Sequence, residues 1–380
     1  MMDPASRRPI HILPPEVASK IAAGEVVERP ASVVKELVEN AIDAGATDIQ
    51  VEIRQGGRRL IQVADNGCGI PPDQVELAFA RHATSKLRDV HDLEQIASLG
   101  FRGEALASIA AVAKVTLLTR PPEEAAARRV RVEGGRLVEN RPAASPAGTI
   151  VTVEHLFYNV PARQKFLRQP ATETAHIHDV VTRYAMAYPK RRFQLVQDGR
   201  SAFLSPGNGQ LRDVLAAVLG VETAEALLPI EAEGEHGMRL QGFVGPPSLH
   251  RASRSDIVFF VNRRWIQDRS LSAAVAQAYH TFLPVGRYPV AILLLEMPPS
   301  EVDVNVHPTK REVRFRHGQS VFTLVQAAVR KALTTEAPAA ASLMPSDWMP
   351  SRWHGAQPPF GATPSPPTPS APTTAALWGD

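Results

Sequence analysis

Apolar side chains recur at helical spacing between residues 32 and 44. One side of a helix of 3.6 residues per turn would carry Val33, Val34, Leu37, Val38, Ala41 and Ile42, and Gly45 follows as a stop signal. Similar patterns predict helices at 73–81 and 103–113, and strands at 49–53, 60–65, 115–119 and 149–153. This order predicts an α/β fold of the α+β sandwich kind, with helices on one face of a mixed sheet.

The pattern of elements begins again after about residue 215. A strand at 257–261, a helix at 270–282 and a strand at 290–297 predict a βαβ crossover in a second, smaller domain. From Ala337 onward apolar periodicity stops, and ten of the 33 prolines lie among alanines, serines and threonines. We therefore predict domains at 1–215 and 216–335 and a flexible linker at 336–380, and we expect the chain to be the front part of a longer protein.

Composition narrows the class of protein. Hydrophobic residues make up 44% and charged residues 21%, as in a globular protein with a real core. The single cysteine, Cys68, excludes an internal disulfide and a zinc site of several thiolates. Because the sequence has neither a signal peptide nor a run of about 18 apolar residues, we expect a soluble cytoplasmic protein with no membrane partner.

The polar face of the first helix is the first candidate for chemistry. Glu36, Glu39, Asn40 and Asp43 cluster on the side opposite its apolar residues. Taken alone, such a face is ordinarily a surface that meets water.

Two glycine-containing segments change that interpretation. A predicted strand runs into Asp65, followed by Gly67 and Gly69, so the backbone can turn tightly and approach a ligand ring closely. A carboxylate there can accept a hydrogen bond from the exocyclic amine of adenine. An ordinary surface turn can, however, have the same amino-acid sequence. A further segment, residues 100–106, opens into a predicted helix whose free N–H groups can bind phosphate. Neither a P-loop nor a G-x-G-x-x-G motif occurs.

These elements, in this order, resemble the Bergerat-fold (GHKL) ATPases, which include type II topoisomerase B subunits, large heat-shock chaperones, histidine kinases and MutL mismatch-repair proteins. Within this superfamily, six sequence segments are most similar to those of the MutL family: IAAGEVVERP at 21–30, KELVEN at 35–40, RHATSK at 81–86, GFRGEAL at 100–106, LFYNVPAR at 156–163 and DVNVHPTK at 303–310. The resemblance covers about residues 10–330. It implies a Bergerat-fold ATPase domain followed by a transducer domain of ribosomal-protein-S5-like type.

The resemblance implies roles for particular residues, with ATP and Mg²⁺ as cofactors. Glu36 would activate the attacking water, Asn40 would bind Mg²⁺ and Lys310 would contact the γ-phosphate. Asp65 would read adenine. The remaining nucleotide contacts would be Gly69, Thr84, Lys86, Gly100, Phe101, Arg102, Gly103, Glu104, Ala105, Leu106 and Thr149.

Partners follow partly from charge and partly from the resemblance. Arginines crowd residues 251–269, and Arg263, Arg264 and Arg269 are candidates for binding DNA phosphates; by sequence alone, a solvated arginine surface is as good an explanation. The resemblance implies binding of single- and double-stranded DNA with little sequence preference. It also implies an ATP-dependent homodimer, contact with the mismatch-recognition protein MutS and a downstream helicase or nuclease, and association with the nucleoid.

Three functions remain open. The favoured one is an ATP-hydrolysing switch that couples mismatch recognition to strand-processing enzymes. The second is a DNA-binding scaffold that binds ATP without hydrolysing it. The third is the ATPase half of a type II topoisomerase, which the amino-acid sequence of residues 100–106 disfavours. No D-Q-H-A-x-x-E-like cluster occurs, so no endonuclease activity is predicted for these 380 residues.

Overall fold

A computed structural model describes residues 11–86, 99–100, 103–303 and 312–341. The helices are α1 Pro15–Val26, α2 Pro30–Asp43, α3 Ala105–Val112, α4 Pro161–Phe166, α5 Pro170–Ala187, α6 Leu211–Leu219, α7 Val221–Ala226, α8 Arg269–Ala278 and α9 Gly318–Ala341, with short 3-10 turns η1 Leu77–Phe79, η3 Glu235–Gly237 and η4 Pro299–Glu301. No described helix is long and apolar enough to cross a membrane.

The first sheet has eight strands in the order β5-β4-β3-β6-β2-β1-β7-β8. Their bounds are β1 Asp48–Arg54, β2 Leu60–Asp65, β3 Lys114–Arg120, β4 Ala127–Glu133, β5 Arg136–Ala143, β6 Gly148–Glu154, β7 Arg192–Gln197 and β8 Arg200–Leu204. Only β1 and β7 pair in parallel within it, so the sheet is mixed, as predicted.

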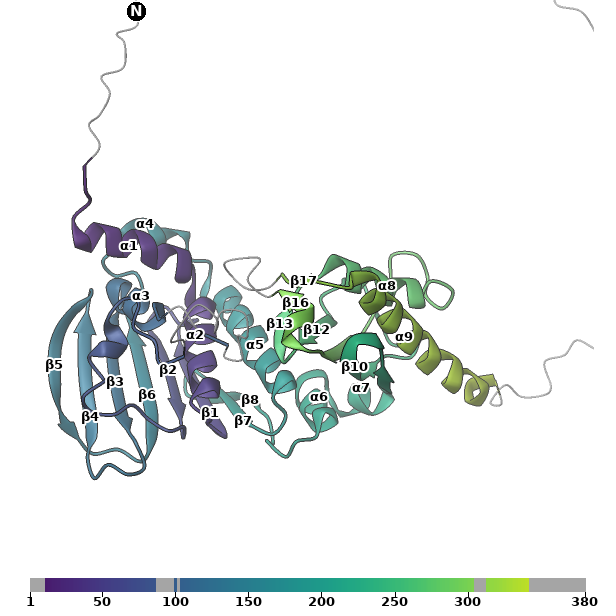
Figure 1. Ribbon diagram of the computed structural model, residues 1–380, viewed down its shortest axis with the longest axis horizontal. Coiled ribbons are helices and arrows are strands. Elements are labelled where there is room, and N and C mark those ends of the chain that lie inside the picture. Colours follow the sequence, from purple (N-terminus) through teal and green to yellow (C-terminus); the bar gives the residue numbers. More distant parts are fainter. Residues whose placement is uncertain (1–10, 87–98, 101–102, 304–311, 342–380) are drawn as a thin grey trace, which may run out of the picture. The chain divides into compact units, whose positions relative to one another are not determined.

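Helices cover one face of this sheet (Figure 1). Along β1 the side chains of Ile49, Val51 and Ile53 are fully buried, whereas the residues between them are partly or largely exposed. This alternation is typical of a sheet with one packed face and one face toward solvent. The apolar side of α2, including Val33, Val34 and Val38, lies in the same core. The opposite side of α2 is therefore left to carry polar chemistry.

The second sheet has five strands in the order β13-β12-β15-β10-β9. The bounds are β9 Leu228–Glu233, β10 Arg239–Val244, β12 Ile257–Val261, β13 Arg264–Ile266 and β15 Ala291–Glu296. Strands β12 and β15 pair in parallel with α8 between them in the chain, which confirms the predicted crossover. Two short ladders pair β11 His250–Arg251 with β14 Tyr288–Pro289, and β16 Val302–Asp303 with β17 Arg314–Phe315.

The two sheets share apolar packing. Val258 and Phe260 from β12, together with Val290 and Ile292 near β15, belong to the core cluster that also contains the helices and strands of the first sheet. A second cluster lies under α8 and α9. Residues up to Glu336 accordingly form one compact unit, and the predicted division at residue 215 stays a prediction.

Three predicted elements differ from the structure. Residues 73–81 form turns and only the short η1. The N–H groups of Phe79 and Ala80 donate to carbonyls three residues earlier, as in a 3-10 helix, and Leu77 is 57% exposed. Helix α8 ends at Ala278 rather than near residue 282. Helix α9 continues to Ala341, inside the predicted linker, and the rest of that segment lies outside the described residues.

Candidate active site

The polar side of α2 holds Glu36 beside a half-buried lysine. The carboxylate of Glu36 lies 3.1 Å from the ammonium of Lys35, and its side chain is 23% exposed. Lys35 also pairs with Glu39 at 3.0 Å. Burial opposes the charge on Lys35, but the two carboxylates outweigh it and raise its pKa. Lys35 is therefore a fixed cation that holds Glu36 from one side.

Glu39, on the polar side of α2, is buried and does not meet water. Only 3% of the residue is exposed, and its Oε1 accepts a hydrogen bond from the hydroxyl of Tyr184 on α5. Burial and the charge of Glu39 raise the pKa of Tyr184 well above its usual value. One turn of helix thus separates a carboxylate packed between α2 and α5 from one that remains partly accessible to solvent.

A second cation lies at the carboxyl end of α2. The ammonium of Lys86 donates to Asn40 Oδ1 at 3.0 Å and to Asp43 Oδ2 at 2.5 Å. The backbone N–H groups of Leu99 and Gly100 donate to the same Asp43 carboxylate, at 3.0 and 3.1 Å. One amide oxygen and one carboxylate oxygen therefore both contact the positive charge of Lys86. Oxygen ligands of these two kinds are also the ones that Mg²⁺ prefers.

The glycine segment packs against the RHATSK segment. Gly103 has φ of 62°, and a Cβ there would lie 2.4 Å from the carbonyl oxygen of Ala83, so only glycine fits. Next to it, a Glu104 carboxylate oxygen lies 3.1 Å from His82 Nδ1. Ala105 then begins α3, so the start of this helix and the segment with Thr84 and Lys86 lie side by side. Phe101, Arg102 and Lys310 lie outside the described residues.

Asp65 anchors the opposite end of the site, where β2 ends. Its Oδ1 accepts a hydrogen bond from the N–H of Gly67 at 2.8 Å. Burial raises the pKa of this carboxyl, although backbone N–H groups of Gly67 and Thr149 oppose that effect. Gly69 has φ of 71°, and a Cβ there would lie 2.6 Å from the backbone carbon of Arg120. The turn after Asp65 is thus fixed by close backbone contacts.

Thr119 is a residue of this end that the sequence analysis missed. Its hydroxyl accepts from the N–H of Ile70 at 2.9 Å, and it lies 2.9 Å from the hydroxyl of Thr149 and 3.2 Å from the carbonyl of Gly148. Thr119 is 1% exposed. A signal was available, because in β3 it occupies the same alternation as buried Val115 and Leu117, where a polar side chain needs partners.

Two further quoted segments also meet. The guanidinium of Arg163 lies where a side chain on Gly24 of α1 would be, and it donates to the carbonyl of Val27 at 3.2 Å. Segments 21–30 and 156–163, more than a hundred residues apart, therefore form one contact.

Comparisons with known proteins agree with this arrangement. A family model described as "Histidine kinase-, DNA gyrase B-, and HSP90-like ATPase" matches residues 28–147, and one described as "DNA mismatch repair protein, C-terminal domain" matches residues 215–334. The Aquifex aeolicus MutL ATPase domain complexed with ADP is 31% identical with a TM-score of 0.57, over 72% of this chain and 94% of that one. The chain belongs to the MutL family.

Other similar proteins support the same family. The MutL of Symbiobacterium thermophilum is 51% identical over 336 residues, which are 88% of this chain and 52% of that protein. The MutL of Syntrophobacter fumaroxidans is 50% identical over 333 residues, with 88% and 50% covered. A crystal structure of the N-terminal domain of a DNA repair protein, 25% identical, has a TM-score of 0.74 and covers 85% of this chain.

Membership in the MutL family confirms the predicted fold, a Bergerat-type ATPase domain followed by a smaller α/β transducer domain. The chain spans about half the length of the curated MutL relatives that it matches.

The arginines expected on a DNA-facing surface do not share one environment. Arg263 and Arg269 are exposed. Arg264, by contrast, is only 8% exposed, although both it and Arg263 line a small cavity with Glu39 and Tyr184. Because it is buried, Arg264 does not fit the role of a DNA-phosphate contact in this MutL chain. Nearby, the guanidinium of Arg183 on α5 lies 3.9 Å from the ring centre of Trp265.

Proposed function

We propose that this chain binds ATP together with Mg²⁺, hydrolyses it, and acts as the ATP-driven switch of DNA mismatch repair. The observation that carries the proposal is the convergence on α2 of Glu36, Asn40 and the Lys86 ion pair. The turn after Asp65 is joined to the end of α2 by the hydrogen bond from the Cys68 N–H to the Ala44 carbonyl. Family membership supports the proposal, since a similar MutL ATPase domain is complexed with ADP.

Adenine would be selected at the Asp65 end. A carboxylate there can accept the exocyclic amine, and the partners that already fix its position are backbone N–H groups. Thr119 and Thr149 hold the neighbouring backbone, so little rearrangement is needed when a base binds. Gly69 would let the chain pass close to the ring.

Hydrolysis would depend on Glu36 as general base toward water. Its carboxylate is partly exposed and is held by Lys35, so it can reach a water molecule without being free to rotate. Asn40 would supply an oxygen ligand to Mg²⁺, which when bound neutralises charge on the phosphates. Before that, Lys86 must release Asn40 Oδ1, and its ammonium is then available to a phosphate oxygen.

The rest of the phosphate site would come from two sources. Free N–H groups at the start of α3, next to Gly103, favour a negative charge there. Lys310, which follows β16 in the chain, would add a positive charge from the second predicted domain. Since that charge would pair with phosphate in only one arrangement of the chain, ATP would favour that arrangement.

The switch would act through partners that the family implies. We propose that ATP favours a homodimer, that Arg263 and Arg269 contact DNA phosphates without reading sequence, and that MutS and a downstream helicase or nuclease bind the ATP-loaded form. The exposure of both arginines supports the DNA contact.

The test of the ATPase proposal compares wild type with Glu36→Ala and the isosteric Glu36→Gln, measuring ATP binding and phosphate release with and without Mg²⁺. Both variants should bind ATP and lose about 10²–10⁴-fold in phosphate release. Glu52→Gln, a change at a carboxylate on β1, is the matched control and should hydrolyse normally. Equal hydrolysis in wild type and Glu36 variants would reject the mechanism. ATP binding without hydrolysis in any protein would favour the scaffold.

DNA binding is tested separately. Arg263→Glu and Arg269→Glu should weaken binding to single-stranded DNA equally for unrelated sequences and reduce its dependence on salt concentration. Arg200→Glu, at an exposed position on β8, serves as control because it makes the same charge change on the other sheet. If all three variants weaken binding alike, net charge explains the effect and the local surface does not.

A further inference from the structure

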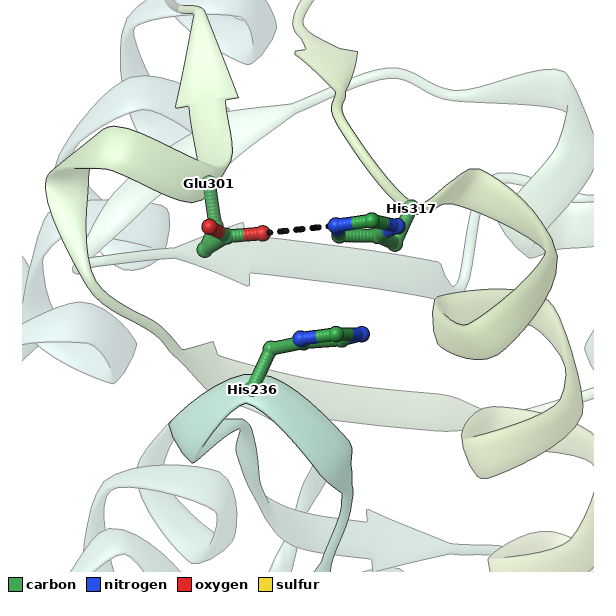
Figure 2. A group of neighbouring side chains, drawn as sticks. All are labelled: His236, Glu301 and His317. Carbon is green, nitrogen blue, oxygen red and sulfur yellow. Dashed lines mark ion pairs between the residues drawn. The ribbon is translucent and has the colours of Figure 1, made fainter.

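Three side chains outside the proposed ATP site gather around one point. His236 comes from η3, between β9 and β10; Glu301 ends η4, just before β16; and His317 precedes α9, just after β17. One ligand atom from each lies within 4.8 Å of the others. Figure 2 shows the ring of His317 facing the Glu301 carboxylate, with the ring of His236 parallel to it. The two ring centres are 4.0 Å apart and the planes differ by 9°.

Glu301 is the least satisfied member of the group. Its Oε2 is buried and has no hydrogen-bond partner among the residues that the structure describes; the nearest cationic candidate is His317 Nε2, at 3.5 Å. Its Oε1 lies 4.0 Å from the guanidinium of Arg316, whose side chain is 67% exposed and so screened by solvent. Burying a carboxylate oxygen without a donor is unfavourable. The atom therefore has the 3.5 Å ion pair with His317 but no hydrogen bond from a described residue, and a bound cation could satisfy it more fully.

The backbone at His236 adds a second, independent observation. Its φ is 54° and its ψ is 30°, in the left-handed region that non-glycine residues seldom adopt. Gly237 follows directly in the chain. The residue in the left-handed conformation is nevertheless His236, whose imidazole lies near Glu301 and His317. Backbone conformations of this kind persist where the surrounding structure holds them, and they cluster at active sites and ligand-binding sites.

We propose that His236, Glu301 and His317 form a binding site for a divalent metal ion of the zinc class. Two imidazole nitrogens and one carboxylate oxygen are the donor set that zinc takes from proteins when a fourth position is left to water. Mg²⁺ and Ca²⁺ prefer oxygen donors, so two histidines disfavour them.

The site requires a modest rearrangement. Zinc bonds of about 2.0–2.1 Å bring tetrahedral donors to roughly 3.3 Å from one another, closer than the present limit of 4.8 Å. The stacked rings must also turn so that both nitrogens point at one ion. The side chains of His236 and His317 are 41% and 42% exposed, so solvent rather than packed protein lies on one side of each ring. Ring rotation toward Glu301 is therefore open to both.

Such a site would join three segments that are distant in sequence. Glu301 and His317 flank the ladder in which Val302 pairs with Phe315 and Asp303 with Arg314. His236 belongs to the turn between β9 and β10 of the five-stranded sheet. An ion bound by all three would tie this ladder to the sheet and stabilise the folded state by mass action.

The experiment titrates ZnCl₂ into the full chain after removal of metal, by calorimetry and by thermal denaturation, in a Cys68→Ser background because Cys68 is exposed. We expect one equivalent of zinc and an increase in Tm. His236→Ala, His317→Ala and the isosteric Glu301→Gln should each lower zinc affinity at least tenfold and remove the Tm increase. Substituted Co²⁺ should show the visible absorption of a four-coordinate site.

The matched control is His280→Ala, which removes an exposed histidine at the end of α8 and leaves the cluster intact. Its zinc affinity should equal that of the Cys68→Ser parent. Absence of zinc binding in the parent, or equal affinity in the cluster variants and the control, overturns the proposal. Circular dichroism without metal shows that each variant is folded, and Glu301→Gln, which preserves side-chain shape, decides the question if a histidine variant is not.

Discussion

The two ends of the candidate ATP site are held by different kinds of contact. At the Asp65 end, the partners are backbone groups and threonines on adjacent strands, of which Thr119 is 1% exposed. At the Lys86 end, one lysine side chain bridges Asn40 and Asp43, and both members of its ion pair retain some exposure, 22% for Lys86 and 11% for Asp43. The first end is built into the sheet, whereas the second depends on side chains that can exchange partners.

We infer from this difference that the two ends of the site have different roles in nucleotide binding. A base site gains affinity when it needs no reordering, because the entropy of ordering has already been lost on folding. A phosphate site that holds an internal cation must exchange that cation when a ligand arrives, and it can therefore report whether a ligand is bound. The following changes test the two halves of this comparison.

The largest effect is expected from Asp43→Ala at the Lys86 end. The change removes the acceptor of Lys86 and of the Leu99 and Gly100 N–H groups together. Phosphate release should fall about 10²-fold, since catalysis is sensitive to small displacements, and stability should fall by about 1–3 kcal/mol. Asp48→Ala, whose carboxylate pairs with Arg192 on an exposed surface, should change stability by less than about 1 kcal/mol. Similar losses in both variants would contradict the comparison.

A smaller effect is expected from Lys35→Met. Without the ammonium, Glu36 loses the group that holds it, and kcat should fall about tenfold while ATP affinity is retained. Lys35→Arg should recover part of the rate because it restores a cation near Glu36 and Glu39. Steady-state kinetics and ATP-binding titrations separate the two parameters. Unchanged kcat together with lower stability would make Lys35 a structural residue only.

At the Asp65 end, Thr119→Val keeps the side-chain shape but removes the acceptor of the Ile70 N–H. We expect stability to fall by about 1–3 kcal/mol, because a buried donor is left unpaired. ATP affinity should weaken by about tenfold or less, with kcat unchanged. Thr116→Val, on the other face of the same strand, is the matched control. A change in kcat without a change in affinity would place Thr119 with the catalytic end instead.

The smallest effect concerns pH. Burial raises the pKa of Asp65 above 3.8, so the folded chain binds this proton more tightly than the unfolded chain does. The contribution of Asp65 to stability must then fall as pH rises from 3.8 through the raised value. Relative to Asp65→Asn, wild type should lose stability across that window and stay level above it. Chemical denaturation at a series of pH values provides the measurement, and a difference that grows in the opposite direction contradicts the assignment.

Much of the fold could be predicted because local patterns determine it. Short apolar runs at residues 60–65 and 257–261 predicted β2 and β12 with the bounds that they have, and parallel pairing of β12 with β15 followed from the helix between them. Residues 73–81 have a helix-like composition, but Val75 is fully buried while Leu77 is 57% exposed, and the segment forms turns and a short 3-10 turn instead of a regular helix. Local pattern is insufficient where tertiary contact decides the structure.

The site was predicted less completely, for a related reason. Three of the site residues could be found because each lies in or beside a short sequence motif that resembles a known family: Glu36, Asn40 and Asp65. One partner of Glu39 is Tyr184, 145 residues away, and no spacing along the chain indicates that pairing. Arg264 was grouped with its exposed neighbours because the sequence cannot show that one arginine of the run turns inward.

The apolar packing shared by the two sheets has a consequence for how the chain folds. Phe260 and Ile292 lie in the same core as the strands around β1, so neither half buries all its apolar surface alone. Melting of one half would expose part of the other, and heat should therefore unfold both together in one calorimetric transition. A fragment cut near residue 215 would carry an uncovered apolar surface and be prone to aggregate.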